Sequence, residues 1–244
     1  MSGHSHFATI KRQKAANDAV KGNLFSKLAR NIMIAAKGGA DPDMNFKLRV
    51  EIDKARAASM PRENIDRAIS KATTEAANLQ EMVYEGFGPG GISVIVQATS
   101  DNKNRIAQEM KNLFEKHGGQ MAGPGAVAFN FVSKGFMLVK KTDNPEDQML
   151  KMIDLGIEDV TETPDGIEVY VAPDKLGEER KKFIDSGFEL TETELIMKPL
   201  NVQTVTDVNI ATKALNFLES IEDHDDVSQV FSNLDIPDET MKNV

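Results

Sequence analysis

The order of secondary-structure patterns between residues 136 and 197 restricts this part of the chain to very few folds. Short apolar runs alternate there with helical patterns, and the tight turn Pro164-Asp165-Gly166 separates two of the runs. We predict strands at 136–141, 158–162, 167–171 and 188–197, and helices at 145–155 and 174–186. This β-α-β-β-α-β order is typical of the ferredoxin-like fold, which is built from split βαβ units in one sheet.

The segments on either side of this unit predict a second sheet to which both contribute. Before the unit come a strand, a helix and a strand, at 92–99, 102–117 and 126–132; after it come a short strand, a helix and a strand, at about 202–205, 207–221 and 227–236. Each half alone is a β-α-β fragment, whereas the two halves together complete a split βαβ sheet. We therefore predict a discontinuous domain, 80–134 plus 199–244, with a ferredoxin-like domain, 135–198, inserted in it.

The first 79 residues have a helical pattern instead. Apolar side chains recur with a period near 3.6 in three segments, 17–37, 45–59 and 61–72. Gly38-Gly39 ends the first segment, and Pro61 suits the start of the third. The predicted fold class is thus α+β, with an N-terminal helical domain (1–79) followed by two ferredoxin-like domains, one inserted in the other.

Positive charge is concentrated at the start of the chain. Residues 1–40 contain seven Lys or Arg and one acid, a net charge of +6; the whole chain carries −9, so residues 41–244 carry −15. A basic arm on an acidic body is typical of a protein that binds a polyanion such as nucleic acid. We predict that the seven cations of the arm contact phosphate groups: Lys11, Arg12, Lys14, Lys21, Lys27, Arg30 and Lys37.

Five other residues are candidates for the same interface. His4, His6 and Phe7 lie in the arm and offer ring nitrogens to phosphates or a stacking surface to bases, although a disordered tail explains the histidines equally well. Lys103 and Arg105 lie in the first turn of the helix predicted at 102–117, where the helix N-terminus favours anions. We expect these two residues to make secondary contacts only.

Several classes of function are disfavoured by what the sequence lacks. It has no cysteine, no run of about eighteen apolar residues that could span a membrane, and no signal peptide. Gly86-x-Gly88-x-x-Gly91 matches the dinucleotide fingerprint in spacing only, because it precedes a strand rather than a helix and contains Pro89. We interpret His117 as a helix C-cap and the acidic stretch 222–226 around His224 as a solvated helix end. We expect no enzyme activity, no metal and no cofactor.

Blocks of residues along the whole chain resemble one family. Gly3-His4-Ser5 and the spacing of Ile10-Lys11, Lys14, Lys21-Gly22 and Lys27-Leu28 are similar to the opening signature of the YebC family, which includes the mitochondrial translational activators of cytochrome c oxidase. Further matching blocks are 52–58, Met60-Pro61, 84–91, 101–105 and 116–119. His6-Phe7 stands where the family usually has Lys-Trp, and Asn31 where Glu is usual, so we expect affinity or target choice at the arm to differ.

The resemblance implies three domains and non-enzymatic control of gene expression through nucleic acid. Family members are described as transcriptional regulators that bind DNA, while the organellar branch acts on translation, so ribosomal RNA or mRNA, and the ribosome itself, are the alternative partners. Since the resemblance begins at Gly3, we expect no mitochondrial presequence, and hence a cytoplasmic protein, here taken as a monomer. A small-molecule sensor is a third hypothesis, from analogy with other ferredoxin-like domains.

Overall fold

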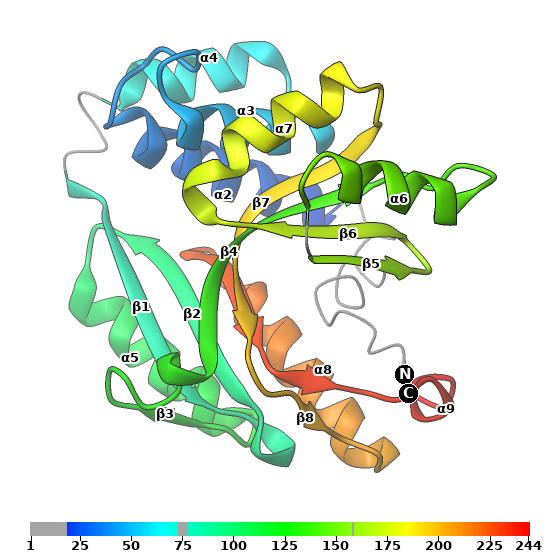
Figure 1. Ribbon diagram of the computed structural model, residues 1–244. Helices are drawn as coiled ribbons and strands as arrows, with labels where there is room; N and C mark the ends of the chain where they lie inside the picture. Colours follow the sequence, from blue (N-terminus) through cyan, green and yellow to red (C-terminus); the bar gives the residue numbers. More distant parts are fainter. Residues whose placement is uncertain (1–18, 73–77, 158) are drawn as a thin grey trace.

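The computed structural model describes residues 19–72, 78–157 and 159–244, with side chains from Leu24 onward. Three helices come first and form a bundle, which is drawn in blue to cyan in Figure 1: α2 (Ala19–Ala36), α3 (Phe46–Ala57) and α4 (Arg62–Lys71). Ile32, Leu48 and Ile65 pack in its core. The Asn45 side chain caps α3 by accepting a hydrogen bond from the Leu48 amide at 3.1 Å. The helical periodicity of the sequence predicted these three helices.

The first sheet combines strands from both sides of the segment 131–199. Its order is β3-β1-β2-β9, all pairs antiparallel, and two helices cover one face. The elements are β1 (Gln80–Phe87), β2 (Ser93–Ser100), α5 (Lys103–Lys116), β3 (Gln120–Ala122), α8 (Val208–Glu222) and β9 (Val227–Ser232). Because β1 lies between β2 and β3, the latter two run parallel and form a split βαβ unit with α5. The 3-10 turn η3 (Pro89–Gly91) joins β1 to β2, so the glycine-rich loop leads into a strand.

The second sheet has the order expected of a ferredoxin-like unit, β5-β6-β4-β7. Its elements are β4 (Phe131–Val139), α6 (Pro145–Asp154), β5 (Asp159–Thr163), β6 (Gly166–Val171), the 3-10 turn η5 (Pro173–Lys175), α7 (Leu176–Asp185) and β7 (Leu190–Pro199). Met137 and Val139 face α6 and α7, while Phe136 and Leu138 face the other way. A strand buried on both faces appears in sequence as a continuous apolar run, which is why the second half of β4, residues 136–139, was recognisable within the strand predicted at 136–141.

A shared apolar layer joins the two sheets. Ile95 and Phe231 of the first sheet pack against Phe136, Leu138 and Ile196 of the second, and β4 runs between the two sheets in Figure 1. The helical bundle adjoins α7 and β7.

The remaining elements are the parallel pair β8 (Gln203–Thr204) and β10 (Leu234–Asp235) and the short helix α9 (Asp238–Met241). Among the described residues, no helix is both long and apolar enough to cross a bilayer.

The α+β class, with N-terminal helices followed by sheet units, is confirmed, but individual strands of the first sheet differ from the prediction. Strand β1 was missed, and the predicted strand at 126–132 is instead a turn with the 3-10 helix η4 (Ala128–Asn130), after which β4 begins. The reason is Glu85, whose carboxylate accepts hydrogen bonds from the amides of Gly125, Val127 and Ala128. Those amides are therefore not available to a neighbouring strand. We keep the division into 1–79, 80–134 plus 199–244, and 135–198 as a proposal, with one boundary inside β4.

Candidate nucleic-acid interface

Only part of the interface predicted from the sequence lies in the described structure. His4, His6, Phe7, Lys11, Arg12 and Lys14 lie outside the described residues, and Lys21 belongs to α2 but its side chain is not described. The five others come from two parts of the fold: Lys27 and Arg30 from α2, with Lys37 directly after its end, and Lys103 and Arg105 from the start of α5.

Lys27, Arg30 and Lys37 contact backbone carbonyl groups of later segments. Lys27 Nζ donates to the carbonyl of Glu222 at the C-terminal end of α8, and Arg30 Nη1 donates to that of Asp225 at 2.8 Å. Lys37 Nζ donates to the carbonyl of Leu79, also at 2.8 Å. Carbonyl groups at a helix C-terminus carry partial negative charge and favour cations. Two of the predicted phosphate ligands, Lys27 and Arg30, thus contact the end of α8 and the turn after it.

Arg30 and Arg105 meet on a single carboxylate, that of Asp226. Arg30 Nη1 lies 2.7 Å from Asp226 Oδ1, and Arg105 Nη2 forms a short hydrogen bond to Asp226 Oδ2 and a second bond of 2.9 Å to Ser100 Oγ. Burial raises the pKa of Asp226, but hydrogen bonds from Ser100 and Arg105 and the charge of Arg30 outweigh it, so that the pKa lies below its usual range. Asp226 is therefore ionised at neutral pH. We call Arg30, Ser100, Arg105 and Asp226 the Asp226 cluster.

Local structure places Arg105 at this point. Asn102 caps α5 by accepting a hydrogen bond from the Arg105 amide at 3.0 Å, and this fixes the first turn of the helix over the end of β2. Lys103 lies in the same turn and is exposed. Arg105 Nη1 also contacts Glu109 Oε2 at 2.9 Å. The first turn of α5 thus carries two cations, as predicted, but one of them is held by acids of the protein itself.

The two described histidines have structural positions. His117 caps the C-terminus of α5, as predicted. His224 Nδ1 accepts a hydrogen bond from the amide of Asp226, so the proton of the neutral ring resides on Nε2, which donates to Glu109 Oε2 at 3.1 Å. Within the part of the chain that the structure describes, no group of three or more His, Cys, Asp or Glu side chains could hold a metal ion.

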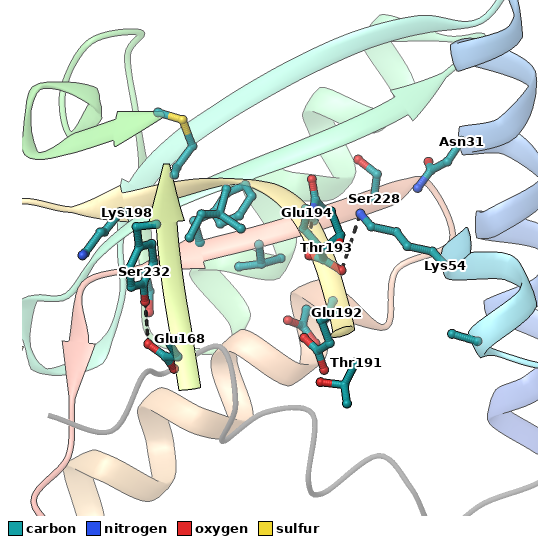
Figure 2. A pocket seen from close by; sticks show the side chains of 18 of the residues that line it. Asn31, Lys54, Glu168, Thr191, Glu192, Thr193, Glu194, Lys198, Ser228 and Ser232 are labelled. Carbon is teal, nitrogen blue, oxygen red and sulfur yellow. Dashed lines mark hydrogen bonds and ion pairs between the residues drawn. The ribbon is translucent and has the colours of Figure 1, made fainter. Parts of the chain in front are cut away.

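A cleft of about 1140 Å³ lies where the helical bundle and the two sheets meet. α2, α3, β6, β7 and β9 contribute to its lining. Figure 2 shows Lys54 of α3 pointing toward Glu194 of β7, with Ser228 of β9 beside them. On the opposite wall, Glu168 accepts a hydrogen bond of 2.6 Å from the Tyr170 hydroxyl, and Lys198 Nζ lies 3.5 Å from the centroid of the Tyr170 ring. Lys54 contacts Glu194, while Glu168 and Lys198 both contact Tyr170, so the cleft has a lining of mixed charge.

The sequence did not point to either of the residues on which these contacts converge, Asp226 and Glu194. Asp226 is one of several acids in the stretch 222–226, and its partner Arg30 lies 196 residues away in the sequence. Glu194 is one of two glutamates at alternate positions of β7, and the packing of α3 on this strand distinguishes it. No periodicity or spacing signal marks either residue.

Two family models together match almost the whole chain. The model of the TACO1/YebC protein N-terminal domain matches residues 5–75, and that of the TACO1/YebC second and third domain matches residues 79–234. The chain belongs to the TACO1/YebC family. The resemblance seen in the sequence is thereby confirmed.

Curated relatives and one solved structure agree with this membership. A "Probable transcriptional regulatory protein" of Dictyoglomus turgidum is 43% identical over 249 residues, covering 100% of both chains. A protein of the same name from Acetivibrio thermocellus is 44% identical over 238 residues, covering 96% of this chain and 98% of the relative. The crystal structure of a conserved hypothetical protein from Aquifex aeolicus superposes with a TM-score of 0.83 at 37% identity, covering 91% of this chain and 93% of that one.

Proposed function

We propose that this TACO1/YebC protein is a non-enzymatic regulator of gene expression that binds nucleic acid through its basic N-terminal arm. The distribution of charge carries the proposal, since residues 1–40 have a net charge of +6 and residues 41–244 a net charge of −15. An acidic body repels a polyanion, so affinity has to come from the arm. The protein is further proposed to act in the cytoplasm, as a monomer and without a cofactor.

The described contacts support a leading role for the arm. Lys27, Arg30, Lys37 and Arg105 all donate to acceptors within the protein, whereas Lys103 is exposed on α5. Cations already bonded to the protein contribute less to counterion release than cations in solvent, because binding phosphate requires them to exchange partners. This leaves Lys11, Arg12 and Lys14 as the residues expected to dominate affinity.

DNA is the first candidate target. Relatives that are 40 to 44% identical carry the name "Probable transcriptional regulatory protein", which favours control of transcription. In this mode the arm contacts duplex phosphates, and the described domains recruit or exclude other proteins. Sequence preference would then show as protection of particular duplex sites.

Action on translation is the second candidate, and the charge of the body favours it. A surface carrying −15 over residues 41–244 is poorly suited to cover an open duplex. A thin basic arm can instead enter a crevice lined with RNA, as on a ribosome, while the acidic sheets remain outside it. In this mode we expect the protein to show little preference among duplex sequences.

Gradient sedimentation of a gently prepared lysate separates the two candidates. The protein is followed across the fractions with and without nuclease and at two salt concentrations, and retention on mixed-sequence duplex DNA is measured in parallel. If the protein migrates with ribosomes or their subunits and high salt abolishes this migration, the translational mode is supported. If the protein stays at the top of the gradient and is retained on duplex DNA, the transcriptional mode is supported. A protein that neither sediments with RNA nor binds DNA at low salt would refute the proposal.

A further inference from the structure

The Asp226 cluster joins two arginines from different parts of the fold on one buried carboxylate. Arg30 comes from the helical bundle and Arg105 from the first turn of α5 beside the first sheet. We propose that Arg30, Arg105 and Ser100 form a phosphodiester-binding site, in which the Asp226 carboxylate occupies the anion position until nucleic acid displaces it. This inference rests on the proposed function and adds a masked second site to the arm.

The chemistry of the cluster fits a phosphate as well as a carboxylate. The two oxygens of Asp226 each accept from a different guanidinium group, and Arg105 Nη2 also donates to Ser100 Oγ at 2.9 Å. A phosphodiester likewise presents two oxygens that accept charge-assisted hydrogen bonds, and guanidinium groups bind carboxylate and phosphate with the same geometry. The spacing that Asp226 imposes on the two arginines is therefore also suitable for one phosphate.

The arginines are accessible, while the carboxylate they hold is not. Their side chains are 25% and 43% exposed for Arg30 and Arg105, against 6% for Asp226. A phosphate can approach the outer edges of both guanidinium groups from solvent and compete with Asp226 from that side.

Neighbouring charges extend the site toward the arm. Lys27 lies one turn before Arg30 on α2, and Lys103 lies in the same first turn as Arg105. The acids that face the cluster are Glu109, 2.9 Å from Arg105, and Asp101, 3.8 Å from it. The arm directly precedes α2 in the sequence, so Lys27 and Arg30 are the cations with described side chains that lie nearest to it along the chain. Displacement of Asp226 then loosens the contact between the helical bundle and the first sheet.

The test compares Asp226→Asn with Asp225→Asn in the full-length protein. Both variants remove one negative charge at adjacent positions, but only the carboxylate of Asp226 contacts the arginines in the described structure. Binding of a labelled 20-nucleotide mixed-sequence RNA and of a 20-base-pair DNA duplex is measured by fluorescence anisotropy over a series of salt concentrations. We expect the Asp226→Asn variant to bind both probes about three- to tenfold more tightly than the Asp225→Asn variant. Because one further phosphate is contacted, the logarithmic salt slope should also become steeper by about 0.7 to 0.9.

A second variant separates unmasking from a general change in charge. Adding Arg30→Gln and Arg105→Gln to Asp226→Asn must abolish the gain in affinity and in slope, while thermal melting verifies that each variant is folded. Equal affinity and slope for folded Asp226→Asn and Asp225→Asn would overturn the inference. If the wild-type protein still binds through the arm in that case, the proposed function stands. If neither the wild-type protein nor any variant binds either probe, both the inference and the proposed function fail.

Discussion

Lys54 Nζ lies 3.6 Å from Glu194 Oε1, and this pair joins the helical bundle to the second sheet. Glu51 Oε1 lies 3.3 Å from the same ammonium group, and Gln229 of the first sheet donates to Glu194 Oε2 at 3.3 Å. Glu194 thereby contacts side chains from both other units. Burial lowers the pKa of Lys54, but the carboxylates of Glu194 and Glu51 outweigh it and raise the pKa, which keeps the side chain charged.

Substitution of Lys54 by Met should destabilise the protein strongly. The side chains of Lys54 and Glu194 are only 18% and 10% exposed, so removing the cation leaves two carboxylates in poorly hydrated surroundings. We expect a loss of about 3 kcal/mol in the free energy of unfolding, measured by urea denaturation. The matched control is Lys47→Met, because Lys47 and its partner Glu81 are 51% and 58% exposed and the pair is worth about 1 kcal/mol or less. Equal losses in the two variants would contradict a structural role for the Lys54 pair.

The arm itself should determine the salt dependence of nucleic-acid binding. Replacing Lys11, Arg12 and Lys14 by Ala removes up to three phosphate contacts, which lowers the magnitude of the logarithmic salt slope by about 2 to 3. The control variant replaces Lys140, Lys141 and Lys151 of the second sheet unit by Ala, an equal change in net charge at a remote site. Anisotropy titrations at several salt concentrations give both slopes. An unchanged slope in the arm variant would exclude the arm from the interface.

The parts of the fold that were predicted correctly depend on local sequence. Ile32, Leu48 and Ile65 follow helical periodicity, and the helices that contain them were predicted near their observed bounds. The ferredoxin-like order of the second sheet unit was also recognisable, because β6 is an apolar run and the turn Pro164-Asp165-Gly166 separates it from β5. Local patterning is informative where one element buries one continuous face.

The parts that were missed depend on contacts between distant segments. Strand β1 carries Glu81, Glu85 and Gly86, which interrupt the apolar alternation, and its pairing with β2 and β3 stabilises it. The same Glu85 binds the backbone of the turn that was predicted as a strand. Partners of Asp226 lie 121 and 196 residues away, so the cluster could be assembled only once the fold was known.

Gly86 of β1, the first glycine of the glycine-rich stretch, should be required for packing rather than for binding a nucleotide. A Cβ atom on Gly86 would lie 2.5 Å from the Gln120 carbonyl oxygen and 2.5 Å from Phe114 Cε1, and neither the backbone of β3 nor the buried ring can move away easily. We expect Gly86→Ala to cost about 3 kcal/mol, measured as a loss of free energy of unfolding in urea. A Cβ atom on Gly123 would meet no heavy atom within 4 Å, so Gly123→Ala should change the free energy of unfolding by about 0.5 kcal/mol or less. Similar stabilities for the two variants would argue against close packing at Gly86.

Glu85 should stabilise the turn before β4 in a pH-dependent manner. Its carboxylate accepts from the amides of Gly125, Val127 and Ala128 at 2.7, 2.8 and 2.9 Å. Burial raises the pKa of Glu85, but these three donors outweigh it and hold the pKa below its ordinary value of 4.5. Replacement by Gln leaves one acceptor oxygen and places an amide nitrogen against backbone donors. We expect this change to lower the free energy of unfolding by about 2 kcal/mol at neutral pH.

The sign of the pH effect follows from the lowered pKa. A carboxylate with a lower pKa in the folded protein contributes its full stabilisation above the unfolded pKa, about 4.5, and loses it as the pH falls through the folded value. The difference in unfolding free energy between wild type and Glu85→Gln should therefore be constant at about pH 6 to 8 and shrink below about pH 4.5. Glu81→Gln on the same strand is the control, since Glu81 is exposed and its ion pair with Lys47 contributes little. A difference between wild type and Glu85→Gln that grows as the pH falls would show that the carboxylate is not the stabilising form.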